Sequence, residues 1–452
     1  MEDHLLKMSM DYLVILPDGN NNKETNKLCL VLAFTGVVAQ YCSVRGCCPG
    51  RDDECTTPYF DTLCYCDEFC YLTATDCCPD FRYRCLRVPP PQESRRDICI
   101  SNGVTYNQGD TIKINCNRCM CRDRGDGIAE FVCEENSCLV ESDVINDINY
   151  GNFGWRSSNY SFLWGLTQKD GVRYRLGTFS PQAAFASMIN VEFDGESGAL
   201  PKSFDARDRW GGLIGEVMDQ GNCGSSWAIS TTSVASDRLA IQSEGRERIR
   251  LSAQHLLSCN RVQGQLGCGG GNLDRAWWFI RRTGLPSQEC YPYRSGMSED
   301  TEMDQLPCRK PYVWSPCPER GVTSAYLRST PPYVIAPKES DIMQEIYRNG
   351  PVQATFKVKK DFFVYRTGVY RHIKSTVAGD ESDPNQAGWL SVKIVGWGVD
   401  ETDPRRPIKY WLVANSWGRS WGEDGMFRIV RGENESDIES YVLGVWMQVH
   451  TV

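Results

Sequence analysis

Residues 219–241 read DQGNCGSSWAISTTSVASDRLAI, and this stretch decides the fold of the C-terminal half of the chain. It predicts a helix from Ser226 to Leu239, with Trp227 in the first turn. Ser252 is well placed to cap a second helix, because a serine hydroxyl satisfies a free amide at a helix N-terminus. A third helix over Asp274–Arg282 extends this helical part of the chain.

After residue 350 the pattern changes to strands. The segments VQATFKV, SVKIVGWG, KYWLVANS and MFRIVRG are short, rich in β-branched and aromatic residues, and separated by glycines. The C-terminal half is therefore expected to have an α+β fold, with a helical half first and a strand-rich half second.

Longer ordered motifs lie on both sides of the opening stretch. They are LPKSFDARDRWGG from Leu200, GCGGGNLDRAWWFIRRTG, NGPVQATFKV and YWLVANSWGRSWGEDGMFRIVRG. In this order they resemble cathepsin B, a member of the papain family of cysteine proteases, over residues 200–452. The resemblance implies a papain-like fold of two subdomains, a helical half and a β-barrel half, with a cleft between them.

The resemblance also assigns the cleft positions. A papain-like peptidase needs a thiolate at a helix N-terminus, an imidazole, an asparagine that orients the imidazole, and a glutamine in the oxyanion hole. Gln220 matches the glutamine, Asn415 the asparagine, and Trp417 the residue that shields it. Ser226 stands at the cysteine position and Leu390 at the histidine position.

Two catalytic groups are therefore expected to be missing. A serine hydroxyl needs a base, leucine cannot accept a proton, and loss of a general base alone costs about 10²–10⁴-fold in rate. None of the four histidines is expected in the strand that faces Ser226; they are His4, His255, His372 and His450. The sequence predicts an inactive homologue without cofactor or metal. The alternatives are residual cysteine-type peptidase activity and inhibition of active cathepsins as a decoy.

Cysteine dominates the N-terminal third, where 17 of the 23 cysteines precede residue 139. The apolar run LCLVLAFTGVVA at residues 28–39 is too short to span a bilayer and predicts an export signal cleaved after Ala39. We therefore expect a leader over residues 1–39, a secreted protein, and cysteines in disulfides rather than bound to metal.

Two small modules follow the leader. Residues 40–87 contain GCCPGRDDEC, CYCDEFC and DCCPDFRYRC, and resemble a somatomedin B module, although with ten cysteines instead of eight. Their connectivity stays open. After the linker VPPPQ, residues 95–140 contain NGVTYNQGD and NCNRCMC and resemble a von Willebrand factor type C module. This second module includes Arg124-Gly125-Asp126, a candidate integrin motif that is also favourable turn chemistry.

Residues 141–199 lack cysteine and occupy the place of a propeptide. They are expected to stay attached, because self-removal needs an active site. Asn159 and Asn434 begin glycosylation sequons. For the papain-like domain, the resemblance to cathepsin B implies three disulfides: Cys223–Cys268, Cys259–Cys308 and Cys290–Cys317.

The whole combination resembles the tubulointerstitial nephritis antigen family, from which the chain departs at Leu390, where histidine is expected. That family implies a secreted glycoprotein of the extracellular matrix and basement membrane with a role in cell adhesion. The implied partners are laminin, collagen IV, integrins or secreted ligands. A net charge of -9 argues against nucleic acid as a partner.

Overall fold

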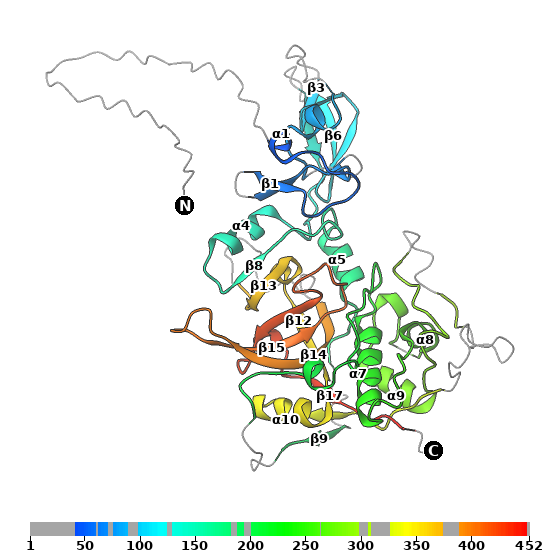
Figure 1. The fold of residues 1–452 in the computed structure, drawn as a ribbon. Helices are drawn as coiled ribbons and strands as arrows, with labels where there is room; N and C mark the ends of the chain where they lie inside the picture. Colours follow the sequence, from blue (N-terminus) through cyan, green and yellow to red (C-terminus); the bar gives the residue numbers. More distant parts are fainter. Residues whose placement is uncertain are drawn as a thin grey trace, which may run out of the picture. The chain divides into compact units, whose positions relative to one another are not determined.

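The computed structural model describes residues 41–59, 62–70, 76–88, 98–123, 129–181, 188–193, 200–262, 264–297, 306–308, 326–373 and 388–449. These residues belong to one compact unit, Gln40–Val452 (Figure 1). The predicted leader, residues 1–39, lies outside the described residues. Among the helices that are described, none is long and apolar enough to cross a membrane.

The helical half is built around α7 (Ser226–Gln242), the helix predicted from the opening stretch. It packs against α8 (Ala253–Cys259) and α9 (Leu273–Arg282) on one side and against the sheet on the other (Figure 1). Ser252 caps α8 as predicted, with its Oγ accepting a hydrogen bond from the amide of His255 at 2.9 Å. A short helix, α6 (Ala206–Arg209), precedes this group.

The strand-rich half is a single ten-stranded sheet. The order is β8-β13-β16-β15-β14-β12-β17-β11-β9, and β10 pairs with β14. The bounds are β8 Trp155–Ser157, β9 Ile189–Val191, β10 Phe204–Asp205, β11 Tyr333–Ile335, β12 Val352–Val358, β13 Tyr365–Tyr370, β14 Gly388–Asp400, β15 Ile408–Ala414, β16 Met426–Val430 and β17 Val442–Gly444. All four predicted strands are present, as β12, β14, β15 and β16, and the mixed papain-like architecture is confirmed.

Two buried ion pairs fix α7 to the strand-rich half. Arg238 donates to Glu345 of α10 (Glu339–Asn349) at 2.7 Å, and neither side chain is more than 1% exposed. Asp237 accepts from Lys393 of β14 at 2.6 Å. Because removing one partner of a buried pair leaves an uncompensated charge, each such change is expected to cost about 3–5 kcal/mol. These pairs hold the C-terminal half of α7 against α10 and β14.

The propeptide-like segment is part of the protein core. It contains α4 (Ser142–Tyr150), β8 and α5 (Gln168–Arg175). Strand β8 pairs with β13, and Leu163 and Leu176 are buried in the same apolar core as the central strands. Release of this segment would expose that apolar surface to water, which disfavours release.

The two N-terminal modules are held by disulfides. The first contains α1 (Cys42–Arg45), β1 (Thr56–Tyr59), β2 (Thr62–Tyr65) and α3 (Phe81–Arg84), with the bonds Cys42–Cys66, Cys47–Cys85, Cys48–Cys55 and Cys64–Cys78. The second contains β3 (Ile98–Ser101), β4 (Val104–Asn107), β5 (Thr111–Ile114), β6 (Asn117–Asp123) and β7 (Ala129–Cys133), with the bonds Cys99–Cys121, Cys116–Cys138 and Cys119–Cys133. The RGD tripeptide lies outside the described residues, between β6 and β7.

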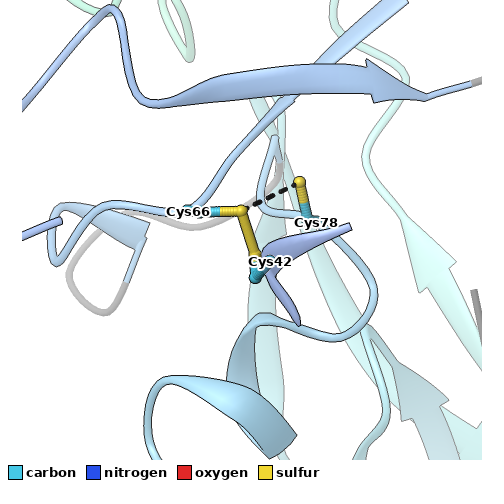
Figure 2. A group of neighbouring side chains, drawn as sticks. All are labelled: Cys42, Cys66 and Cys78. Carbon is cyan, nitrogen blue, oxygen red and sulfur yellow. Dashed lines mark hydrogen bonds between the residues drawn. A yellow bond between two sulfur atoms is a disulfide. The ribbon is translucent and has the colours of Figure 1, made fainter. Parts of the chain in front are cut away.

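Sulfur atoms form the centre of the first module. Figure 2 shows Cys66, bonded to Cys42, with its Sγ 3.4 Å from the Sγ of Cys78, so two disulfides touch. Two buried cysteines of this core, Cys70 and Cys77, are thiols. A hydrogen bond to Cys77, together with burial, raises the pKa of the Cys70 thiol. The raised pKa favours the protonated form of the Cys70 thiol at neutral pH, and a protonated thiol is a weak nucleophile.

We expect Cys70 and Cys77 to be joined by a disulfide when the protein folds in an oxidising compartment. Their Sγ atoms lie within 4.8 Å of each other. Two thiols at such a short separation readily form a disulfide by exchange with a disulfide donor. Peptide mapping of the unreduced, denatured protein should find the two cysteines linked and unlabelled by iodoacetamide. The matched variant Cys70→Ser should leave Cys77 labelled. Labelling of both cysteines in the parent protein would show that they remain thiols.

Candidate functional site

Ser226 stands at the first position of α7, where the helix N-terminus would stabilise a thiolate in a cysteine peptidase. Its side chain is fully buried. Next to it, the Trp227 indole donates to the carbonyl of Gly267 at 3.1 Å, which fixes the first turn against the glycine-rich loop. The helix therefore presents the nucleophile position with its usual support, but with a hydroxyl in place of a thiol.

Leu390 is the third residue of β14, opposite Phe356 of β12 in the antiparallel register. It is fully buried in the apolar core that also contains Leu176 and Trp417. The following residue, Ser391, accepts a hydrogen bond from Ser230 of α7 at 2.7 Å, so β14 lies directly beside the first turns of the helix. The imidazole position is filled by a hydrocarbon side chain that cannot take up a proton.

The side chain of Asn415 has a buried hydrogen-bond donor that is unpaired among the described residues. Its Oδ1 accepts from the amide of Ser416 at 2.7 Å, but its Nδ2 is buried and makes no hydrogen bond with any described residue. A buried polar atom without a partner costs about 1–3 kcal/mol, so native proteins rarely keep one. The side-chain amide of Asn415 is therefore only partly satisfied among the described residues.

Gln220 now connects the two halves of the domain. Its Oε1 accepts from the hydroxyl of Ser416 at 2.6 Å, and its amide nitrogen donates to the Ser416 carbonyl at 2.8 Å. Its Nε2 donates to the carbonyls of Tyr174, Leu176 and Cys223 at 3.0, 3.2 and 2.8 Å. The oxyanion-hole donor is therefore already occupied, and two of its three acceptors belong to the propeptide-like segment.

The cleft is filled by the chain itself. Residues 177–179 form a short ladder with Gly271, whose amide donates to the Gly177 carbonyl at 2.9 Å and whose carbonyl accepts from Phe179 at 3.0 Å. On the other wall, the Thr178 amide donates to the carbonyl of Trp389 at 3.2 Å. The Thr178 hydroxyl lies 2.9 Å from the hydroxyl of Ser226. Residues 177–179 are thus hydrogen-bonded to both walls of the groove.

Arg175 anchors this segment. Its guanidinium donates to the carbonyl of Gly221 at 2.8 Å and to Oδ1 of Asn222 at 2.9 Å, and it lies over the ring of Phe162. Its carbonyl accepts from the Trp417 indole at 2.6 Å. Burial lowers the pKa of Arg175 to about 10, and no carboxylate among the described residues pairs with it. The anchor is therefore made of hydrogen bonds to loop carbonyls and amides.

Comparison with known proteins places this geometry in a family. A papain family cysteine protease domain matches residues 200–446. The chain is 45% identical to rat tubulointerstitial nephritis antigen-like over 91% of its length and 89% of that protein. It is 41% identical to human tubulointerstitial nephritis antigen, over 91% of this chain and 87% of that protein.

The chain belongs to the papain family and, within it, to the tubulointerstitial nephritis antigen group. Among solved structures it is similar to procathepsin B S9 from Trypanosoma congolense, with a TM-score of 0.59 and 33% identity over 69% of this chain and 100% of that one. It is also similar to procathepsin L2 from Tenebrio molitor, with a TM-score of 0.52 and 26% identity over 66% of this chain and 86% of that one.

The disulfides of this tubulointerstitial nephritis antigen relative join Cys223 to Cys268 and Cys259 to Cys308, the pairs that the resemblance implied. Cys290 is also disulfide-bonded, but Cys317 lies outside the described residues. Of the two sequon asparagines, Asn434 lies in an exposed turn and Asn159 is half-buried. Both remain predicted glycosylation sites.

The described histidines lie away from the nucleophile position. His372 Nδ1 pairs with Asp361 at 3.1 Å, and His255 is buried among the rings of Phe279, Tyr291 and Tyr326. Neither is hydrogen-bonded to Ser226, whose side-chain partner is Thr178. His4 and His450 lie outside the described residues.

His255 is expected to make stability depend on pH. Burial lowers its pKa from 6.5 to about 4, so between these values the unfolded chain binds a proton that the folded protein does not. Stability should be complete above pH 6.5 and fall by about 3 kcal/mol as the pH approaches 4. Urea unfolding across this range should show that loss in the parent protein and not in His255→Phe. Parallel pH profiles for the two proteins would contradict the assignment.

The sequence analysis predicted degenerate positions at Ser226 and Leu390, but it did not predict the residues that fill the groove. Residues 141–199 were predicted to be propeptide-like as a block, with no prediction of which residues reach Ser226. One signal was present: Gly177 lies between Leu176 and Thr178 with φ of 106°. A Cβ placed there would come 2.0 Å from the carbonyl oxygen of Gly224. A glycine at this point marks the closest approach of the segment to the base of the cleft.

Proposed function

We propose that this chain is a secreted, non-catalytic binding protein of the extracellular matrix. One observation carries the proposal: the Ser226 hydroxyl is hydrogen-bonded to Thr178 of its own chain, where a peptidase would hold a thiolate ready for substrate. Among the described residues no base is hydrogen-bonded to Ser226, and Leu390, which the resemblance assigns to the imidazole position, lies inside an apolar core.

The chemistry supports loss of catalysis rather than replacement of one nucleophile by another. A serine nucleophile depends on a neighbouring base to remove its proton, and a buried hydroxyl without one stays protonated near neutral pH. Two further residues match the papain-like site. Gln220 is hydrogen-bonded to Ser416, and the Nδ2 of Asn415 has no hydrogen-bond partner among the described residues. The contacts of Gln220 across the two halves of the domain explain its retention, whereas the Asn415 side chain bonds only to the adjacent Ser416 amide among the described residues.

Because the cleft is occupied, we expect the ligand to bind at another surface of the protein. The sequence allowed the cleft to hold a ligand, but residues 174–179 already fill it, so a ligand would have to displace them. The disulfide modules and the outer faces of the papain-like domain are therefore the better candidates. Laminin, collagen IV and integrins are the proposed partners, and Arg124-Gly125-Asp126 is the proposed integrin contact. The disulfide framework supports secretion, since such bonds persist in oxidising compartments.

Surface-binding measurements test this proposal. The full chain should bind laminin, collagen IV or a purified RGD-dependent integrin saturably, and Ser226→Ala should bind equally well. Asp126→Glu, which keeps the charge but lengthens the side chain, should abolish only the integrin component. Absence of saturable binding to all three would contradict the proposal. Binding that Ser226→Ala removes would instead place the ligand in the cleft.

A further inference from the structure

The arginines of the protein are unevenly paired. Although the net charge is -9, four arginines of the helical half have no carboxylate partner among the described residues. Other arginines do have one, both in the same half (Arg238 and Arg250) and outside it (Arg371, Arg419, Arg428 and Arg431). The unpaired ones considered next lie together on α9 and the loop before it: Arg261, Arg275, Arg281 and Arg282.

The described part of the loop, residues 260–262 and 264–267, lies against the first turn of α9. The Asn260 side chain donates to the carbonyl of Arg275 at 3.2 Å, and the Asn272 side chain donates to the carbonyl of Gly264 at 3.0 Å. A Cβ placed on Gly264 would come 2.8 Å from Nη1 of Arg275, so this guanidinium rests on the loop backbone. The loop and the helix therefore present one continuous surface.

The other side chains extend this surface at both ends. A Cβ on Gly267 would come 2.8 Å from Nη1 of Arg261, so Arg261 also lies along the loop. On the helix, Trp278 is 52% exposed although it is a large aromatic residue, and the guanidinium of Arg281 lies 5.2 Å from its ring centre. Arg275, Trp278 and Arg282 follow an i, i+3, i+7 spacing, so they share one helix face.

We propose that this α9 arginine surface, made of Arg261, Arg275, Trp278, Arg281 and Arg282, binds sulfated glycosaminoglycan chains. Arginine forks pair with sulfate oxygens through two parallel hydrogen bonds, and unpaired arginines need no internal ion pair to break first. The exposed indole offers a flat apolar face to the C–H side of a sugar ring. From Arg275 to Arg282 the helix rises about 10 Å, a length that suits a run of sulfated sugars rather than one small anion.

This inference rests on the proposed extracellular role, because sulfated glycosaminoglycans are found outside cells. It concerns a different surface from the RGD tripeptide and from the cleft. Figure 1 shows α9 on the side of α7 that faces away from the sheet. An acidic protein is the competing occupant and is separated by the experiment.

The test is binding of the full chain to immobilised heparin over a series of NaCl concentrations. The triple variant Arg275→Ala/Arg281→Ala/Arg282→Ala should bind at least about tenfold more weakly near 0.15 M NaCl, with a salt-dependence slope smaller by about two to three units. Trp278→Ala should weaken binding with little change in slope. The matched control Arg207→Ala/Arg371→Ala/Arg419→Ala removes the same charge from ion-paired arginines and should bind like the parent protein.

Several outcomes would overturn the inference. They are absence of heparin binding, an equal loss in the control variant, and equal binding of desulfated heparin. Competition by polyglutamate as strong as by heparin would assign the surface to an acidic protein instead. If the protein binds heparin but not laminin, collagen IV or integrins, only the proposed protein partners are contradicted. The two proposals can therefore fail separately.

Discussion

Gly177→Ala is expected to displace residues 174–179 from the cleft. The new Cβ would lie 2.0 Å from the carbonyl oxygen of Gly224 and 2.1 Å from its carbon, and the loop that carries Gly224 is held by the Cys223–Cys268 disulfide. A φ of 106° adds strain of about 1–2 kcal/mol for an L-residue, and overpacking adds about 1–3 kcal/mol. Together these costs correspond to at least about a thirtyfold rise in the open population.

Hydrogen exchange measures this directly, because the amides of Thr178 and Phe179 are bound to the two cleft walls. Their exchange should accelerate at least about tenfold in Gly177→Ala. Gly165→Ala is the matched control: it lies in the same segment, also has positive φ, and its Cβ would meet nothing closer than 3.4 Å. Equal protection of the two amides in both variants would show that the segment does not depend on this close approach.

Ser226→Cys combined with Leu390→His, in the Gly177→Ala background, is expected to produce peptidase activity. The thiol would stand at the N-terminus of α7, and the imidazole would meet Asn415, whose Nδ2 lacks a partner and whose Oδ1 could turn toward it. The restored base should contribute about 10²–10⁴-fold over Ser226→Cys alone. The two substitutions should act together far more strongly than the product of their separate effects, because they form one catalytic unit.

Peptide hydrolysis and labelling by an epoxysuccinyl thiol reagent measure this gain. Leu390→Gln, a polar residue that is no base, is the matched control and should give no hydrolysis above Ser226→Cys alone. Adding Asn415→Ala to the restored combination should lower the rate again, since the imidazole loses its orienting partner. A folded combination without hydrolysis or label would show that the scaffold carries a further defect.

Secondary structure could be predicted from the sequence where long motifs coincide with strong local signals for helices, caps and strands. The helix at Ser226, the cap at Ser252 and the strands around Leu390 follow from periodicity, capping chemistry and glycine breaks, and the structure agrees at each. The degenerate positions stay a prediction from the resemblance, which rests on Gln220 and Asn415 lying in motifs whose spacing is independent of the residue at the nucleophile position.

The contents of the cleft could not be predicted in the same way. The contacts of Thr178 with Ser226 and of Arg175 with Gly221 join residues that are 48 and 46 positions apart in the sequence. No local sequence pattern encodes contacts of this range. The unpaired amide of Asn415 likewise depends on what stands across from it. Such features appear only when side chains from several elements are brought together.

The central claim is that this papain-family chain has no peptidase chemistry at Ser226, and its most direct test is a peptide hydrolysis assay on an opened cleft. Gly177→Ala protein and Gly177→Ala/Ser226→Ala protein should both leave fluorogenic peptides uncut, at equal background rates. Hydrolysis by Gly177→Ala that disappears when Ser226→Ala is added would contradict the account and identify the serine as a working nucleophile.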